Sequence, residues 1–127
     1  MTRAVVALTA LALVACHHSD DTPALPTSRD GAREAFTRCM FDRPPAPRDE
    51  ASMEADVRHA LRDDRIAFSV RAGRCALVLE SLRMSDPTIA AFARAWEELL
   101  PLAQASAPDD ILLEQSVRHV GLAYRGW

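Results

Sequence analysis

The sequence predicts an all-α fold, a small irregular bundle of about five short helices. Aromatic residues make up only 6% of a 127-residue chain that is 49% hydrophobic. The core must therefore be built mainly from Leu, Val, Ile and Ala, which favours helices over sheets. Apolar residues also recur three and four positions apart in five segments, a spacing typical of amphipathic helices. The length allows one domain at most.

The first predicted helix covers residues 28–41 and has Ser28 as its N-cap. The run 42–47 must end this helix, because it contains three Pro residues that cannot continue it. The apolar stripe of this helix consists of Ala32, Phe36, Cys39 and Met40.

The second predicted helix covers residues 49–64, and acidic residues in its first turn suit the positive end of the helix dipole. Asp64 continues the apolar stripe of this helix. A buried carboxylate there would need a partner such as Arg71 or Arg74, unless the helix has ended before Asp64. The stripe consists of Met53, Val57, Ala60 and Leu61.

Residues 65–70 alternate between apolar and polar, which is typical of a strand. A single strand would have no partner in this chain, so we interpret the segment as a continuing or distorted helix. The third predicted helix then covers residues 72–84. Its apolar face carries Cys75, Val78, Leu79 and Leu82.

Two clear start signals predict the last two helices. Asp86-Pro87 combines an N-cap with Pro at the first helical position. Pro101 lies inside this fourth helix and is expected to kink it. The fifth helix opens within residues 106–109, a start that is similar to a capping box. The apolar face of the fourth helix carries Ile89, Phe92, Ala93, Trp96, Leu100 and Ala103. That of the fifth helix carries Leu113, Val117, Val120 and Tyr124.

The first 16 residues have the pattern of an export signal. Arg3 is followed by an apolar stretch, residues 4–15, in which only Thr9 is polar. That stretch is shorter than the roughly 20 apolar residues that a permanent membrane-spanning helix needs. Two alternatives remain for this segment. It could be an ordinary secretory signal in which the Cys occurs by chance, or it could be a buried apolar helix. A buried helix would be expected to show polar residues on one face.

The end of this segment, Leu13-Val14-Ala15-Cys16, resembles the lipobox of bacterial lipoproteins, in which a small residue precedes an invariant Cys. The resemblance implies cleavage after Ala15 and lipid attachment to the Cys16 sulfur. In that family an Asp directly after the Cys retains the protein at the inner membrane. Here His17 follows, so the resemblance implies lipid anchoring at the outer membrane.

The predicted organisation therefore has three parts. Residues 1–15 are a lipoprotein signal peptide, residues 16–27 are the lipidated Cys and a flexible tether, and residues 28–127 are a single helical domain. The tether is rich in Pro, Ser, Thr and Asp and has no periodicity. As an arrangement, this layout is similar to that of small helical lipoproteins in GC-rich bacteria.

If Cys16 carries lipid, Cys39 and Cys75 are the two cysteines whose thiols remain free to react. Both lie on the apolar face of a predicted helix. In an oxidising compartment such a pair usually forms a disulfide, which here would join the first helix to the third. Two buried free thiols are an alternative. A redox-active pair is a further one, which the absence of a C-x-x-C motif disfavours.

Charge and composition argue against a nucleic-acid partner. The chain has 15 basic and 18 acidic residues and a formal net charge of −3, whereas nucleic-acid binding needs a basic face. Every basic residue is Arg, and the Arg residues are spread along the chain. The pairs His17-His18 and Asp20-Asp21 offer ligand types that suit Zn²⁺ or Cu²⁺. A mobile tether is not a preorganised site, so we predict no metal and no cofactor.

We find no motif for nucleotide binding, hydrolysis or metal catalysis in the sequence, and we predict that the protein is not an enzyme. His59 and His119 are expected at the surface. The neighbouring carboxylates of residues 63–64, 97–98 and 109–110 point about 100° apart on a helix and do not converge. Trp127 folds back onto the bundle or stays exposed as a possible partner contact.

Three functional hypotheses follow. In the first, the protein is a non-enzymatic interaction or accessory module that Cys16 anchors to the lipid bilayer and that binds an unknown envelope protein. In the second, it binds a small apolar or anionic ligand between its helices. A pocket of roughly several hundred Å³ with convergent Arg side chains would favour this hypothesis. In the third, it is an enzyme, which a perturbed His or carboxylate buried in a cleft would favour.

Overall fold

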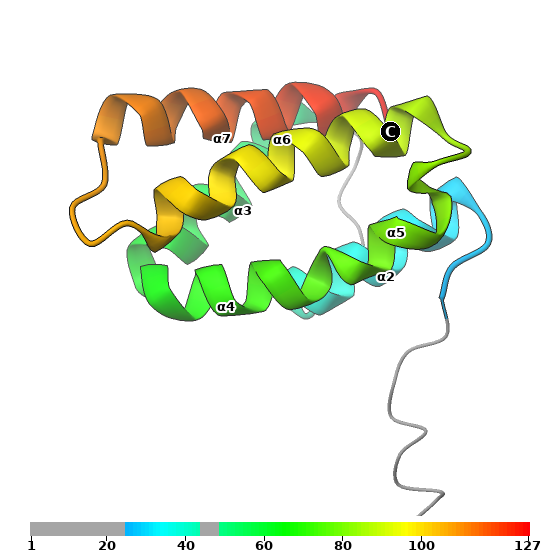
Figure 1. The fold of residues 1–127 in the computed structure, drawn as a ribbon, viewed down its shortest axis with the longest axis horizontal. Helices are drawn as coiled ribbons and strands as arrows, with labels where there is room; N and C mark the ends of the chain where they lie inside the picture. The colour runs from blue at the N-terminus through cyan, green and yellow to red at the C-terminus, as the bar shows by residue number, and fades with distance from the viewer. Residues whose placement is uncertain (1–24, 44–48) are drawn as a thin grey trace, which may run out of the picture.

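The computed structural model of the chain describes residues 25–43 and 49–127. Over this part the protein is all-α, without strands (Figure 1). The helical segments are α2 (Arg29–Phe41), α3 (Glu50–Asp63), α4 (Arg65–Cys75), α5 (Leu77–Arg83), α6 (Pro87–Gln104) and α7 (Asp110–Arg125).

The helices α4 and α5 form one bent helix, because the backbone between them stays helical. Ala76, which separates them, has φ −57° and ψ −27°. Counted in this way, the described bundle has the five helices that the sequence predicts.

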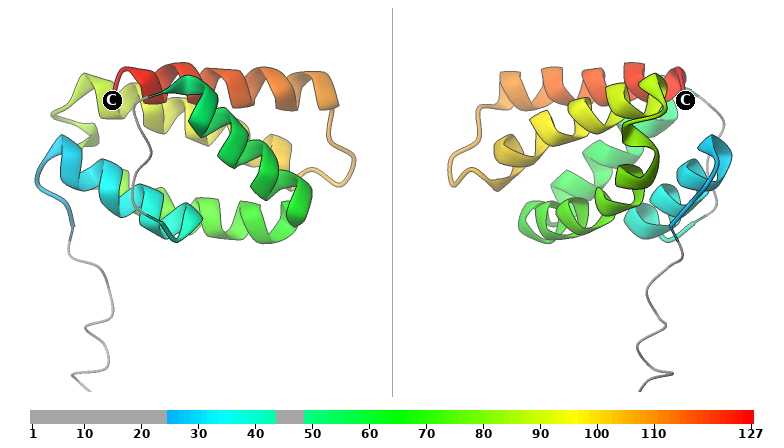
Figure 2. Two further views of the ribbon diagram at one scale, coloured as in Figure 1. Left: turned by 180° about the vertical axis from the view of Figure 1, so that it is seen from behind. Right: turned by 45° about the vertical axis from the view of Figure 1, so that its right-hand side comes forward.

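The helix α6 lies at the centre of the bundle and packs against α4, α5 and α7. In Figure 1, α6 and α7 run side by side along one side of the molecule, and α4 and α5 run along the opposite side. In the left-hand view of Figure 2, seen from behind, α3 crosses the near side diagonally from α7 toward the beginning of α4. The helix α2 packs on α4 and α5.

Side-chain caps fix the beginnings of the longer helices. At each of five positions an oxygen of the capping side chain accepts a hydrogen bond from a backbone N–H of the first turn, which pairs a donor that the helix leaves unpaired. The predicted starts at Ser28, Asp49 and Asp86 are confirmed. The capping residues are Ser28, Asp49, Asp64, Asp86 and Asp109.

The structure confirms that residues 65–70 are helical and not a strand, and it corrects the predicted helix boundaries in residues 65–84. Asp64 has extended backbone geometry (φ −155°, ψ 97°), so α3 ends there. Its carboxylate accepts a hydrogen bond of 3.0 Å from the backbone N–H of Ala67 and starts α4. The segment is therefore a new helix that begins at Arg65, and the third predicted helix does not begin at residue 72. Asp64 is exposed and needs no buried partner.

The fourth predicted helix includes Pro101 in the structure, as its predicted apolar face up to Ala103 indicates. The helix α6 runs through Pro101 to Gln104, so Pro101 does not end it. Its C-terminal end is stabilised from outside, because the Arg65 guanidinium donates hydrogen bonds to the carbonyl oxygens of Ala103 and Ala105. Cations at a helix C-terminus also interact favourably with the helix dipole.

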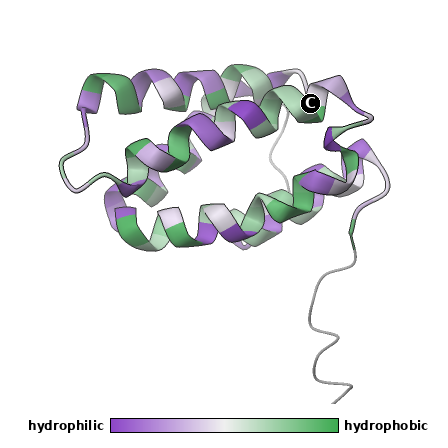
Figure 3. Ribbon diagram, in the orientation of Figure 1, coloured by the Kyte–Doolittle hydropathy of each residue, from purple (hydrophilic) through white to green (hydrophobic). Residues whose placement is uncertain are grey.

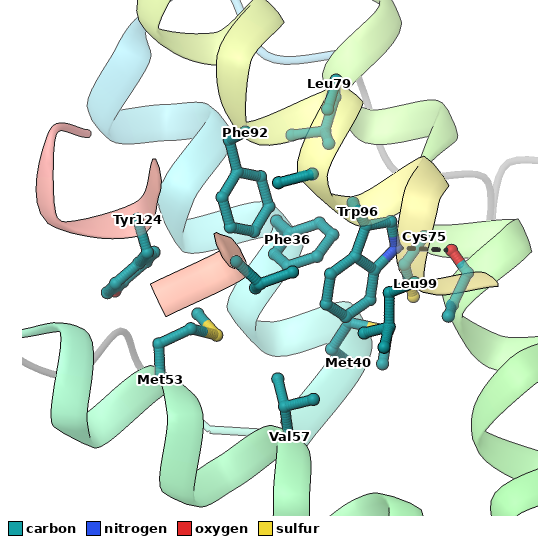
Figure 4. Close-up of a cluster of buried hydrophobic side chains, with 14 of the residues drawn as sticks. Phe36, Met40, Met53, Val57, Cys75, Leu79, Phe92, Trp96, Leu99 and Tyr124 are labelled. Atoms are coloured by element: carbon teal, nitrogen blue, oxygen red, sulfur yellow. Dashed lines mark hydrogen bonds between the residues drawn. The ribbon is translucent and has the colours of Figure 1, made fainter. Parts of the chain in front are cut away.

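Hydrophobic and hydrophilic segments alternate along each helix (Figure 3), and the inward-facing hydrophobic residues meet in one core. At its centre, the ring centroid of Phe36 lies 5.1 Å from that of Phe92 and 4.9 Å from that of Trp96, and both ring pairs are nearly edge-on. The indole Nε1 of Trp96 donates a hydrogen bond of 3.1 Å to the backbone oxygen of Ala72 (Figure 4). This bond joins α6 to α4 and pairs a donor that would otherwise be buried without a partner.

The helices α3 and α7 approach each other closely at Gly121. A Cβ atom added at this buried glycine would lie 3.0 Å from the Glu50 carbonyl oxygen and 2.7 Å from the Glu54 Cγ. Any larger residue at position 121 would have to push α3 away from α7. The absence of a side chain at Gly121 thus allows the close spacing of α3 and α7.

Candidate functional site

A groove with a volume of about 360 Å³ opens between α3, the beginning of α4 and α7. Leu61, Leu113 and Val117 give it an apolar floor. Charged side chains form its rim: Arg58, Arg62, Arg65, Asp110 and Glu114. An apolar floor with a few polar groups around it is typical of ligand and peptide sites.

The Arg58–Glu114 ion pair joins the two walls of the groove. The Arg58 Nε on α3 donates to both carboxylate oxygens of Glu114 on α7 at 3.1 Å, and its Nη2 donates to Glu54 Oε2 at 3.1 Å. These hydrogen bonds, with the opposite charges, lower the pKa of Glu114 and raise the pKa of Arg58. The pair therefore stays ionised near neutral pH and uses most of the Arg58 hydrogen-bonding capacity.

The other two arginines of the rim, Arg65 and Arg62, differ in whether they already have hydrogen-bond or ion-pair partners. Arg65 donates to the last carbonyl groups of α6. Arg62 is exposed on the last turn of α3 and has no ion pair within residues 25–43 and 49–127. Arg62 is thus the cation of the rim that is best placed to meet an anionic group from outside.

Sequence reasoning did not identify this groove. Its signal was present in the sequence, because Arg58, Arg62 and Arg65 are spaced i, i+4 and i+7, which places arginines on one helical face. That spacing crosses the boundary at Asp64, where α3 ends and α4 turns away. The third arginine therefore reaches the groove from a different helix, and the opposite wall comes from residues 108–117.

The predicted cysteine pair is joined in the structure. Cys39 on α2 and Cys75 at the end of α4 form a disulfide with a Cα–Cα distance of 5.7 Å, within the usual range for such bonds. It links the first helix to the third, as the sequence predicts. Cys16 and the candidate metal ligands His17, His18, Asp20 and Asp21 lie outside the described residues.

The structure contradicts the interpretation of Trp127 as a possible partner contact. Its side chain is fully buried, with a relative exposure of 0%. Its ring centroid lies 4.7 Å from that of Phe92, and its Nε1 donates a hydrogen bond to the Arg29 carbonyl oxygen. Trp127 folds back because both its apolar ring and its polar N–H find partners in the bundle.

The histidines and the carboxylate pairs of the described chain do not form a second site. His59 and His119 are exposed, as the sequence predicts, and so are the paired acidic residues at positions 63–64, 97–98 and 109–110. Within the described ranges, no group of three or more His, Cys, Asp or Glu side chains is arranged to hold a metal ion.

Comparison with protein-family models, curated proteins and solved structures finds no match to this chain. Among the described residues, none of the helices has the length and apolar character needed to cross a bilayer.

Proposed function

We propose that this chain is the precursor of a lipid-anchored bacterial envelope protein whose helical domain is a non-enzymatic interaction module. The support for export and anchoring is the resemblance of Leu13-Val14-Ala15-Cys16 to a lipobox. Acyl chains on Cys16 would hold the protein on the bilayer, because each buried CH₂ contributes about 0.8 kcal/mol and two or three chains make attachment effectively permanent.

The observation that carries the interaction role is the groove between α3 and α7. Its apolar floor accepts an apolar side chain, and Arg62 on its rim suits a carboxylate beside that side chain. The Arg58–Glu114 pair keeps the two walls in place before anything binds. We therefore propose a segment of an envelope protein, with an apolar and an acidic residue close together, as the partner of this groove.

The anchoring is tested by two substitutions at neighbouring positions. Cys16→Ser removes the sulfur nucleophile, so incorporation of radiolabelled lipid and partition into detergent should be lost. His17→Asp supplies the acidic residue that retains lipoproteins at the inner membrane. It should keep the lipid and move the protein there from the outer membrane. Unchanged lipid incorporation in Cys16→Ser would rule out the lipobox, and recovery of the parent in inner-membrane fractions would rule out the proposed location.

The interaction role is tested by photo-crosslinking in intact cells. A photoreactive residue at position 62 is expected to give one protein adduct, whereas the same residue at position 94, an exposed Arg on α6, should not. Leu113→Ala removes part of the groove floor and should weaken the adduct from position 62. Equal adducts from positions 62 and 94, or no effect of Leu113→Ala, would contradict a partner in the groove.

A small anionic amphiphile is the second candidate occupant of the same groove. The volume of about 360 Å³ lies in the range of small-molecule sites, and Arg62 lies on its rim. Native mass spectrometry of the purified protein decides between the two. A bound mass of a few hundred daltons that disappears in Arg62→Gln supports the small ligand. A groove without such a mass, together with a protein adduct from position 62, supports the protein partner.

A further inference from the structure

The bent helix α4–α5 has a second apolar face, which points away from the core. Ile66, Val70 and Leu77 are 56%, 68% and 63% exposed, and their spacing of i, i+4 and i+11 places them in one line along the helix. We call these three residues the outer stripe. The residues buried in the core lie on the opposite side of the same helix: Phe68, Ala72, Cys75 and Leu79.

The outer stripe has a gap in its middle, where Gly73 has no side chain, and no other part of the described chain covers it. Gly73 lies between Val70 and Leu77 on this face, and a Cβ added there would meet no atom within 4 Å. Met84, directly after α5, is 96% exposed and adds an apolar side chain near the end of the helix. The exposed apolar surface thus follows the length of α4–α5.

The charge of this segment is opposite to that of the whole chain. Residues 65–79 contain three Arg and no acidic residue, although the chain has a formal net charge of −3. Arg71 reaches the Met40 carbonyl oxygen at 3.2 Å. Arg74 is exposed beside the outer stripe and has no ion pair among the described residues. Exposed apolar residues flanked by Arg are typical of helices that lie on anionic membrane surfaces.

The path of the chain brings the predicted anchor to this same side of the molecule. The Ser81 hydroxyl on α5 donates a hydrogen bond of 2.9 Å to the carbonyl oxygen of Pro26, so the described chain begins beside α5 (Figure 1). Ser81 lies one helical turn beyond Leu77. Leu25 lies nine positions after Cys16, and this connection spans at most about 32 Å when extended.

We propose that the outer stripe, with Arg74 beside it, is the surface through which the domain lies on the phospholipid bilayer. This inference rests on the proposed lipid attachment at Cys16, which holds the domain close to the membrane. A short connection gives the second contact a high effective concentration, so three partly inserted side chains suffice for a stable orientation. The groove between α3 and α7 then belongs to other helices and stays available to a partner.

The test uses the full chain in native membranes that contain a photoactivatable phospholipid. Covalent lipid labelling is mapped by mass spectrometry, and radiolabelled-lipid incorporation reports the state of Cys16. The loss variant is Val70→Asp with Leu77→Asp. Its matched control on α7, Ile111→Asp with Leu122→Asp, changes side chains that are 72% and 50% exposed. The gain variant, Gly73→Leu, fills the gap in the outer stripe.

In the parent, labelling is expected to concentrate on residues 65–84. The loss variant should lower it by about tenfold or more, because a carboxylate is far less favourable in lipid than Val or Leu. The control should keep the labelling, and Gly73→Leu should raise it. Arg74→Gln should weaken labelling in anionic membranes by about fivefold, since one basic residue contributes about 1 kcal/mol near such a surface.

Lipid incorporation at Cys16 with labelling spread evenly over all helices would overturn this inference alone. Cross-linking of residues 65–84 to a second copy of the chain would also overturn it, in favour of a dimer. Absence of lipid at Cys16 in the parent would overturn the anchoring and this inference together, so the two failures are distinguishable.

Discussion

The indole Nε1 of Trp127 donates a hydrogen bond of 3.0 Å to the backbone carbonyl oxygen of Arg29, which lies 98 positions earlier in the chain. The bond connects the region after α7 to the first turn of α2. Around it, the Trp127 ring packs against Phe92 and Tyr124 with centroid distances of 4.7 and 5.9 Å. The beginning and the end of the described bundle are therefore held by one buried side chain.

Trp127→Ala is expected to lower the free energy of unfolding by about 3–5 kcal/mol, because it leaves a large cavity in the core. Trp127→Phe should lower it less, since it keeps an aromatic ring and loses only the hydrogen bond and part of the volume. Chemical denaturation measures both. Leu122→Ala, at a half-exposed position on α7, is the control and should stay within about 0.5 kcal/mol of the parent. A similar stability of Trp127→Ala and the parent would contradict the burial of Trp127.

Reduction of the Cys39–Cys75 disulfide is expected to lower Tm by more than about 10 °C. The chain-entropy model gives about 4 kcal/mol for a loop of this length, and each kcal/mol corresponds to about 4–8 °C in a domain of this size. Calorimetry with and without reductant measures the difference. Cys39→Ala and Cys75→Ala should have similar effects, and the double variant should be little worse than either. Additive losses would indicate two independent thiols instead of one bond.

Acid is expected to weaken the contact between α3 and α7. The Arg58 hydrogen bonds and charge lower the pKa of Glu114 below its usual value of 4.5. The pair therefore stabilises the fold above about pH 4.5, and its contribution is lost as the pH falls through the lowered pKa. Because both side chains are partly exposed, the contribution should not exceed about 1 kcal/mol.

A pH series of unfolding curves for the parent and Glu114→Gln checks this expectation. The two should differ at pH 6 and converge in acid, and an NMR titration of the Glu114 carboxyl should have its midpoint below 4.5. Glu34→Gln, in an exposed pair within α2, is the matched control. A difference that persists unchanged in acid would mean that Glu114 acts through packing and not through its charge.

The same substitution is expected to have opposite effects at two helical glycines. Gly73→Ala should stabilise the protein by about 0.5–1 kcal/mol, because α4 gains helix propensity and the added methyl meets nothing within 4 Å. Gly121→Ala should destabilise it by about 1–3 kcal/mol, because its Cβ would lie 3.0 Å from a backbone oxygen of α3. Denaturation midpoints measure both, and equal signs would contradict the close approach at Gly121.

The helix boundaries that the sequence predicts correctly are those set by local chemistry. Asp86-Pro87 begins α6 in the structure because a side-chain cap and a Pro at the first position act within one turn. The disulfide was also predictable, since the apolar face of each helix already placed Cys39 and Cys75 inward. These features depend on a few neighbouring residues, so no knowledge of the tertiary fold was needed.

The features that the sequence did not reveal depend on contacts between distant segments. Asp64 both ends α3 and caps α4, and the outward-facing Ile66 and Val70 gave the new helix an alternating pattern that is typical of a strand. Trp127 had no periodicity to place it, because its partners come from α2, α6 and α7. The groove likewise requires residues of α7 opposite those of α3.

Trp127 is the last residue of the described core to be synthesised. Chains are synthesised from the N-terminus, so residue 75 becomes available before residue 127 does. Cys39 and Cys75 lie in segments that precede α6 and α7, and they can be oxidised while the aromatic core still lacks its last member. The disulfide between α2 and α4 would then hold a partial bundle, and its apolar surface would stay exposed until α6, α7 and Trp127 pack against it. Under the proposed export, the chain would cross the membrane before it folds, and this interval is when it would depend most on protection from aggregation.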